Sequence, residues 1–187
     1  MNNFFIIILL LVIGVIFLWG MFVYNVLIAG RNGIKNAESG IDAQLQKRYD
    51  VIPNLVATVK SYAMHENSVL EQITRLRQLA LQSENAQQKK QVDAAIDASL
   101  KHIFAISENY PNLKANENFL QLQAALNEIE GQLAAARRAY NAAVTQYNNT
   151  VESFPSSILA SIFGFAAYHW FENTPEARQS PQITGKL

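Results

Sequence analysis

The sequence predicts an all-α membrane protein: an N-terminal transmembrane helix that continues into an antiparallel bundle of long helices with a short apolar C-terminal helix. Three observations predict this fold. The chain begins with a long uncharged apolar run. Apolar residues then recur at spacings of three and four along most of the chain, which is the period of an α-helix. Glycine and proline, with 8 and 5 residues among 187, are scarce, so few positions interrupt a helix.

The apolar run extends from Phe4 to Tyr24 without a charge, and the first charged residue of the chain is Arg31. A helix needs about 20 apolar residues to cross the hydrocarbon core of a bilayer. Trp19 and Tyr24 stand towards the end of the run, where amphipathic rings favour the membrane interface. The run is too long, and its start lacks the basic residue, for a cleaved signal peptide. We therefore expect residues 1–30 to be an uncleaved transmembrane anchor, with a buried core helix as the less favoured alternative.

Basic residues follow the anchor but do not precede it: Arg31, Lys35, Lys47 and Arg48 all come after the apolar run. The positive-inside rule counts Lys and Arg near the ends of a span. It predicts that the body of the protein is cytoplasmic and that the short N-terminus lies outside.

Residues 31–154 are expected to form the long-helix bundle. Helical patterning continues from the anchor to about Arg48. Pro53 lacks an N–H and restricts the residue before it, so the pattern allows either a kink or a new helix start between Tyr49 and Pro53. The next helix, over residues 52–83, is predicted by one apolar stripe, formed by Ile52, Val56, Val59, Ala63, Leu70, Ile73 and Leu76.

Two further helices complete the predicted bundle. The first follows residues 83–85 and ends at a turn over residues 109–112, where Asn and Pro are turn formers. Its stripe is Val92, Ile96, Leu100, Ile103 and Ile106. The stripe of the second is Phe119, Leu122, Leu126, Ile129, Leu133, Ala136, Tyr140, Ala143 and Tyr147. Because this stripe lasts four heptads, it indicates coiled-coil-like packing.

Asparagines recur near these stripes, and two roles are open for them. Buried Asn fixes the register or the oligomeric state of a coiled coil, whereas Asn on a wetted flank has no such role. The residues are Asn25, Asn32, Asn36, Asn54, Asn116, Asn118, Asn141 and Asn148.

The end of the chain divides into a short apolar helix, residues 155–171, and a polar tail, residues 172–187, which is expected to be poorly ordered. The helix itself is predicted from Ile158 to Phe171, after a cap at Ser156 or Ser157. It is too short to span a bilayer. It could pack on the bundle, in a subunit interface or in the membrane interface. An interfacial helix usually has a charged face, which is absent here, so packing against protein is favoured.

The sequence gives little support for catalysis. There is no Cys, which excludes disulfides and cysteine nucleophiles, and the net charge is zero, which gives no support to nucleic-acid binding. His65-Glu66 begins like the zinc protease motif HExxH, but Val69 stands in place of the second His. A metal-dependent hydrolase could use His65, Glu66 and His102, but zinc needs a third protein ligand or more, and none is recognisable beside the two His. We therefore predict no enzyme and no catalytic, cofactor-binding or metal-binding residues.

Several motifs in order along the chain carry a family resemblance. They are Ile41-Asp-Ala-Gln-Leu-Gln-Lys-Arg48, Ile52-Pro-Asn-Leu-Val56, Tyr110-Pro-Asn-Leu-Lys-Ala-Asn116, Phe119-Leu-Gln-Leu-Gln123, Ala136-Arg-Arg-Ala-Tyr-Asn141 and Phe154-Pro-Ser-Ser157. Together with Tyr24-Asn25 and Arg31-Asn32, they resemble the LemA family from about Met21 to Phe171.

The resemblance implies a bacterial envelope protein with one transmembrane helix and a helical bundle, located in the cell (inner) membrane. The family has no established enzymatic activity and no catalytic residues to carry over. Its members are often encoded beside a membrane zinc metalloprotease, and a magnetosome protein belongs to it.

We therefore expect a non-catalytic, membrane-anchored scaffold that self-associates, with a role in membrane organisation or envelope homeostasis. The expected partners are the lipid bilayer and other copies of the chain, with a membrane metalloprotease as a further candidate and no nucleic acid. The alternative is an adaptor for a membrane protease or another envelope complex, and the metal-dependent hydrolase comes third.

Overall fold

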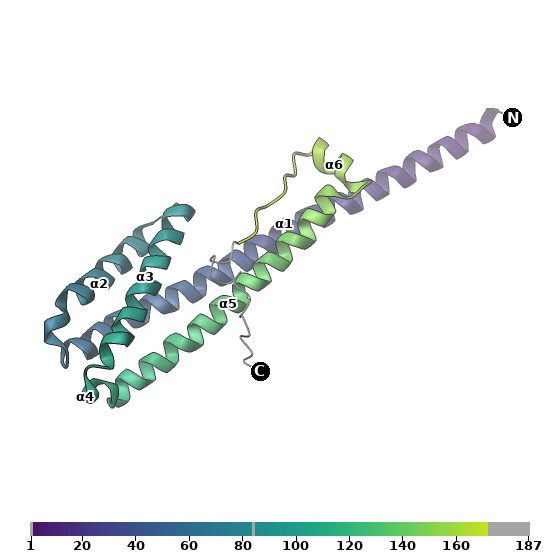
Figure 1. Cartoon of the computed structure of the whole chain (residues 1–187). Coiled ribbons are helices and arrows are strands. Elements are labelled where there is room, and N and C mark those ends of the chain that lie inside the picture. Colours follow the sequence, from purple (N-terminus) through teal and green to yellow (C-terminus); the bar gives the residue numbers. More distant parts are fainter. Residues whose placement is uncertain (1, 84, 172–187) are drawn as a thin grey trace, which may run out of the picture. The chain divides into compact units, whose positions relative to one another are not determined.

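The computed structural model describes residues 2–83 and 85–171 (Figure 1). These residues form helices, turns and irregular segments, without a strand among them. The elements are α1 (Asn2–Lys60), the 3-10 helix η1 (Met64–Glu66), α2 (Asn67–Gln82), α3 (Ala86–Ser107), α4 (Pro111–Lys114), α5 (Glu117–Glu152) and α6 (Ser156–Ile162). The predicted all-α fold with a long apolar N-terminal helix is confirmed. The predicted polar tail, residues 172–187, lies outside the described residues.

α1 continues without interruption through Pro53, so the chain does not begin a new helix there. Proline has no N–H to donate to the carbonyl four residues earlier, which in this helix belongs to Tyr49. The Nε of Arg77 on α2 donates to that carbonyl oxygen at 2.7 Å. The arginine supplies the hydrogen bond that Pro53 cannot make, and α1 extends to Lys60.

The single helix predicted over residues 52–83 is wrong, because the chain turns between α1 and α2 and forms η1 there. The N–H of Ala63 donates to the carbonyl of Val59 at 2.9 Å and closes the end of α1. No glycine or proline marks this turn. The apolar stripe nevertheless has a gap here, since Glu66 and Asn67, where a stripe at helical spacing would continue after Ala63, are polar.

The predicted breaks before α3 and before α4 are confirmed, and asparagine caps two of the helices. Asn85 precedes α3, and its Oδ1 accepts a hydrogen bond from the N–H of Gln87 at 2.8 Å. Pro111 is the first residue of α4, where its missing N–H costs nothing. Asn116 precedes α5, and its Oδ1 accepts from the N–H of Phe119 at 2.9 Å.

The predicted C-terminal helix from Ile158 to Phe171 is wrong over its second half, because α6 ends at Ile162. Gly164 follows with a φ of +69°, a conformation that glycine adopts without strain. The N–H of Phe165 then donates to the carbonyl of Ala160 at 2.9 Å, which closes the helix end. Residues 165–171 continue as irregular chain, called here the strap.

α1 and α5 each contribute to two compact units. Of the described residues, unit 1 comprises 2–41 and 135–171, and unit 2 comprises 42–83 and 85–134. The core of unit 1 is formed by Val23, Leu27, Ile34, Val144, Tyr147, Val151 and Ala160. In unit 2, the α2–α3 hairpin packs with its segments of α1 and α5 (Figure 1), and fully buried side chains include Ile52, Leu55, Ile73, Ile96, Ile103, Leu113, Phe119 and Leu133.

The predicted stripe of α5 is buried at Phe119, Leu126, Ile129, Leu133 and Tyr147 and half-buried at Leu122, Ala136, Tyr140 and Ala143. Val144 and Val151, which the heptad pattern passes over, are buried as well. An α-helix of 3.6 residues per turn drifts away from a strict seven-residue repeat. The buried side of the helix therefore shifts towards Val144 near its end.

Candidate functional site

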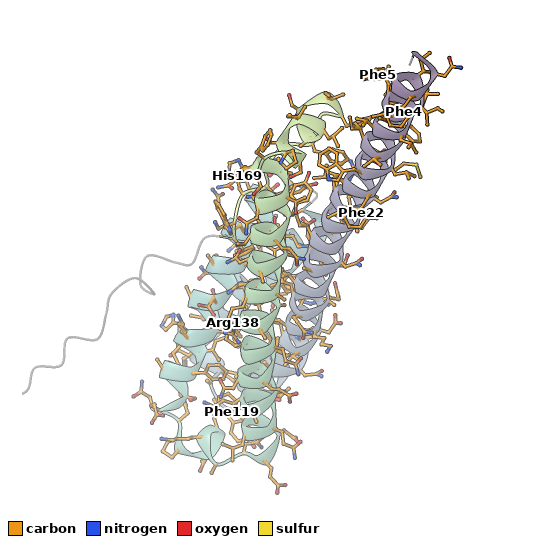
Figure 2. All side chains as sticks on the ribbon, turned by 90° about the vertical axis from the view of Figure 1, so that its right-hand side faces the viewer. Phe4, Phe5, Phe22, Phe119, Arg138 and His169 are labelled. Carbon is orange, nitrogen blue, oxygen red and sulfur yellow. The ribbon has the colours of Figure 1, made fainter. Side chains whose placement is uncertain are left out.

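The N-terminal part of α1 fits a membrane anchor. Among the described residues, α1 is the one helix long and apolar enough to cross a bilayer. The large apolar side chains between Phe4 and Phe22 are exposed, and Figure 2 shows Phe4, Phe5 and Phe22 projecting from the helix. An exposed apolar surface of this length is unfavourable in water, whereas the hydrocarbon of a bilayer solvates it.

Beyond the apolar run, α1 and α5 approach closely at Gly30. The ring of Tyr147, which is 2% exposed, lies directly against this glycine. A Cβ atom at position 30 would lie 3.0 Å from Cδ2 of Tyr147. Glycine therefore allows the aromatic ring to fill the space between the two helices. Burial raises the pKa of Tyr147, because ionisation would place a charge inside this contact.

The strap is fixed to α5 by two asparagine side chains. The Nδ2 of Asn148 donates to the carbonyl of Tyr168 at 2.9 Å, and its Oδ1 accepts from the Tyr168 N–H, also at 2.9 Å. Asn141 makes the same pair with Phe171, at 3.1 and 2.7 Å. Each primary amide thus bonds both backbone groups of one residue, much as a neighbouring β-strand would.

The spacing of the two asparagines matches the reach of the strap. Asn141 and Asn148 are seven residues apart on α5, which is about 10.5 Å along a helix. Tyr168 and Phe171 are three residues apart, which is about 10 Å in an extended chain. The two amides therefore hold this part of the strap in an extended conformation along α5.

Aromatic contacts cover the same segment. The Tyr168 ring meets the Tyr147 ring edge-to-face, with centroids 5.4 Å apart. The guanidinium carbon of Arg31 lies 5.5 Å from the centroid of the Phe165 ring. The indole Nε1 of Trp170 donates to Oγ1 of Thr145 at 2.9 Å. The strap is thus held by neutral amides and by aromatic rings, one of which lies against the guanidinium of Arg31.

α6 packs with one side on the apolar part of α1. Ala160 is 1% exposed, and Cδ1 of Leu159 lies 3.9 Å from where a Cβ of Gly20 would be. The Phe163 ring meets the ring of Tyr24 at a centroid distance of 5.0 Å. The sequence favoured packing of this helix against protein, and one side of it does pack in this way.

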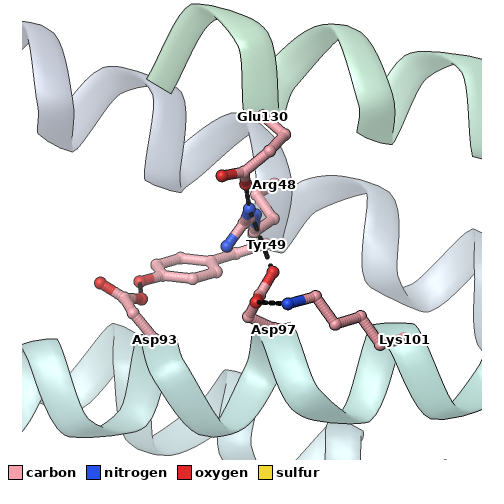
Figure 3. A network of polar contacts seen from close by, with 6 residues as sticks. All are labelled: Arg48, Tyr49, Asp93, Asp97, Lys101 and Glu130. Atoms are coloured by element: carbon pink, nitrogen blue, oxygen red, sulfur yellow. Dashed lines mark hydrogen bonds and ion pairs between the residues drawn. The ribbon is translucent and has the colours of Figure 1, made fainter. Parts of the chain in front are cut away.

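A polar network joins three helices within unit 2 (Figure 3). Arg48 of α1 is 4% exposed and forms an ion pair with Glu130 of α5. Its Nη2 also lies 3.8 Å from Oδ1 of Asp97 on α3, and Oδ2 of Asp97 pairs with Lys101 at 3.0 Å. A buried cation is costly unless it is paired. The network therefore fixes the position of α1 against α3 and α5 within this unit.

Tyr49, beside Arg48, joins α1 to α3 a second time. Its hydroxyl donates to Oδ1 of Asp93, and both residues are buried (Figure 3). Burial is the main cause that raises the pKa of Tyr49, and the hydrogen bond to Asp93 adds to it. Because Arg77 bonds the Tyr49 carbonyl, one residue connects α1 to both helices of the hairpin.

The three residues of the hydrolase hypothesis are placed as follows. His65 and Glu66 lie in η1, and His102 lies on α3 with an exposed side chain. Oε1 of Glu66 is 3.5 Å from the hydroxyl of Tyr110. Within residues 2–83 and 85–171, no three His, Asp or Glu side chains gather into a group that could hold a metal ion.

Sequence reasoning named Asn141 and Asn148 but did not find their role. The structure gives this pair a role that was not considered, because the amides bind the strap of the same chain. Their spacing of seven residues was the signal available. Arg48, Tyr49 and Asp93 were not singled out as a network, since their contacts join residues more than forty positions apart.

Comparison with known proteins places this architecture in a family. The sequence model of the LemA family matches residues 37–184 of this chain. Protein LemA of Metamycoplasma hominis is 30% identical over 166 residues, covering 84% of this chain and 72% of the relative. This chain belongs to the LemA family.

Other relatives of this LemA-family protein carry a different name. Magnetosome protein MamQ 2 of Paramagnetospirillum magneticum is 24% identical over 190 aligned residues, covering 88% of this chain and 70% of the relative. Magnetosome protein MamQ of Magnetospirillum gryphiswaldense is 22% identical, with the same coverage. Neither LemA nor MamQ is the name of an enzyme.

Proposed function

We propose that this LemA-family chain is a non-catalytic helical scaffold that is anchored in the bacterial cell membrane and self-associates there. Its role would lie in membrane organisation or envelope homeostasis. The observation that carries the proposal is the unbroken α1, which begins as an exposed apolar span and continues as a structural helix of the folded body. The magnetosome name of several relatives supports a role in building a cellular structure.

Anchoring gives weak contacts between copies a cumulative effect. Anchors confine all copies to one plane and one orientation, so that each contact forms at a high effective concentration. Many weak contacts between bodies would then suffice to form an array on the membrane.

The oligomeric state of the detergent-extracted protein tests self-association. The chain has a mass of 20.9 kDa, and light scattering coupled to size exclusion should report a multiple of it once the detergent is subtracted. A clean monomer at micromolar concentration would contradict the proposal.

Crosslinking in cells separates the scaffold from an adaptor. Because the chain contains no Cys, a single Gln121→Cys or Ala139→Cys substitution at an exposed position of α5 provides a unique thiol. Self-crosslinks support the scaffold. Stoichiometric products with another protein and no self-crosslink would favour an adaptor for a membrane protease or another envelope complex.

The same single-Cys chains test the orientation of the protein. We propose that the body is cytoplasmic, because Arg31 and Lys35 follow the span and no basic side chain precedes it. An impermeant maleimide should then label Ala139→Cys only after the cells are lysed. Labelling of intact spheroplasts would contradict this orientation.

Metal analysis tests the non-catalytic part of the proposal. Protein purified without chelators should contain metal well below one equivalent per chain. A stoichiometric metal that is lost in a His65→Ala variant, but retained in the control His169→Ala, would favour the hydrolase instead.

A further inference from the structure

α6 and the residues that flank it carry an apolar surface that the described chain leaves exposed. The side chain of Phe154 is 82% exposed, and those of Ile162, Phe163 and Ile158 are 69%, 55% and 54% exposed. These four side chains lie within ten residues of one another in the sequence. Ile158 and Ile162 are four residues apart in α6 and therefore share one face of it. Exposed apolar side chains gathered in this way, called here the α6 patch, mark a binding surface.

The patch lies beside the apolar part of α1. Leu159 contacts the position of Gly20, and Pro155 and Ser156 share a small hollow of about 210 Å³ with Trp19, Phe22 and Val23. The first charge of α1, Arg31, stands eleven residues after Gly20, about 16 Å further along the helix. α6 therefore lies at a level where α1 is still uncharged and apolar.

The segment around α6 meets the conditions for contact with hydrocarbon. No Asp, Glu, Lys or Arg occurs between Glu152 and Glu172. The Ser156 hydroxyl donates to the carbonyl of Thr150 at 2.7 Å. Backbone hydrogen bonds also close both ends of the helix, from Ser157 to Ser153 at 2.8 Å and from Phe165 to Ala160 at 2.9 Å. Polar groups in lipid must be bonded internally, as these are.

We propose that α6 is a second membrane-contacting element, which inserts Phe154, Ile158 and Ile162 between lipid headgroups and acyl chains beside the anchor. Lipid is the occupant, rather than a second copy, because the helix that carries these side chains packs beside the exposed apolar surface of α1, which lipid must already cover. Interfacial helices usually turn a charged face to water. Here the other side of α6 is covered by α1 and needs no charge, since Ala160 is 1% exposed. The inference rests on the proposed anchoring of α1.

Depth-dependent fluorescence quenching tests the inference on the full chain in phosphatidylcholine vesicles that contain brominated lipids. The chain has two tryptophans, Trp19 and Trp170, so each reporter needs a background without the other indoles. Trp170→Phe alone leaves Trp19 as the reporter of the anchor. Ile162→Trp combined with Trp19→Phe and Trp170→Phe reports on α6. Ala139→Trp in the same background is the matched control, at an exposed position of α5.

Bromine near the headgroups should quench the Ile162→Trp indole and leave the Ala139→Trp indole bright. Adding Ile158→Asp, an exposed position, should reduce the quenching at position 162, because a carboxylate resists entry into lipid. Quenching of Trp19 without quenching at position 162 would overturn the inference and leave the anchor intact. Blue-shifted but unquenched emission at position 162 would likewise overturn it, in favour of a second copy as the occupant. Absence of quenching at Trp19 would overturn the anchor and, with it, this inference.

Discussion

Each of the two units of this chain is stabilised by a different kind of contact. In unit 2, charged side chains join the helices: Arg48 pairs with Glu130 and Asp97, and Lys89 pairs with Asp42 at 2.5 Å. In unit 1, amides and rings connect the strap, α5 and α1. The strap of unit 1 is thus held by neutral amides, by ring contacts and by two arginines that lie over rings, Arg31 over Phe165 and Arg137 over Phe171.

This difference follows from the cost of charge near lipid. An ion pair must be removed from water to form, and that cost rises as the surroundings become less polar. A primary amide that bonds a backbone N–H and a carbonyl carries no net charge, so its contribution changes little with salt. Neutral amides therefore suit the strap of the unit with the anchor, whereas ion pairs suit a unit without an apolar span.

Loss of Arg48 should have the largest effect on stability, because it removes the central cation of the ion-pair network in unit 2. Arg48→Ala leaves Glu130 and Asp97 without their buried cation, and we expect a loss of about 3 kcal/mol in the free energy of unfolding. The loss should appear as faster amide hydrogen exchange in α3, while the strap amides keep their protection.

The matched control for this prediction is Arg138→Ala, since Arg138 is an exposed arginine of α5. It should change the free energy of unfolding by less than about 0.5 kcal/mol. Equal effects of the two variants would contradict the role of the network.

Loss of Asn148 should weaken the amide contacts that hold the strap on α5. Asn148→Ala removes both hydrogen bonds to Tyr168 and leaves its backbone groups unsatisfied, at an expected cost of about 2 kcal/mol in strap protection. Hydrogen exchange at the Tyr168 amide measures it, and the exchange rate should respond little to salt. Asn149→Ala, at the neighbouring exposed position, is the control. Unchanged protection of the Tyr168 amide in Asn148→Ala would show that the Asn148 amide does not hold the strap.

The pairing of Arg77 with Pro53 predicts a coupling between two substitutions. Arg77→Ala alone should cost about 1.5 kcal/mol, because the Tyr49 carbonyl loses a charged donor. In a Pro53→Ala background the helix supplies an N–H to that carbonyl, so the same substitution should cost about 1 kcal/mol less. Chemical unfolding followed by circular dichroism measures all four chains of the cycle. Equal costs in both backgrounds would show that the arginine does not compensate for the proline.

Tyr49→Phe should have the smallest effect at neutral pH, about 1 kcal/mol, from loss of the bond to Asp93. Its pH dependence is more informative. Because the folded protein raises the pKa of Tyr49 above 10.0, the stabilisation is complete below pH 10 and declines as the pH rises further. Tyr140 and Tyr147 shift in the same direction, so the decisive quantity is the difference between wild type and Tyr49→Phe. This difference should shrink above pH 10, and a constant difference would contradict the prediction.

Features of the fold that depend on neighbouring residues could be predicted from the sequence. The apolar run, the break at residues 83–85 and the turn at Pro111 are all determined by residues close in the chain. The end of α1 was missed because Ala63 and its neighbours include no helix breaker. The end of α6 was missed because residues 158–171 are almost entirely apolar, and Gly164, after which the chain leaves the helix, is the one residue among them that indicates a stop.

The contacts of the candidate sites could not be predicted, because they join residues far apart in sequence. Continuity through Pro53 depends on Arg77, and the sequence does not reveal that this side chain reaches the Tyr49 carbonyl. The role of Asn148 depends on a segment twenty residues later that would be helical by its pattern alone. Local preference is overridden where such long-range bonds form.

The way in which α5 holds the strap has an evolutionary consequence. Asn141 and Asn148 bind backbone groups, which every residue except proline offers in full. Exposed strap positions such as Ala166 and Ala167 are therefore free to change, whereas the two asparagines and their heptad spacing are not. Among homologous chains we therefore expect the two asparagines of α5 to stay constant while the exposed positions of the strap diverge.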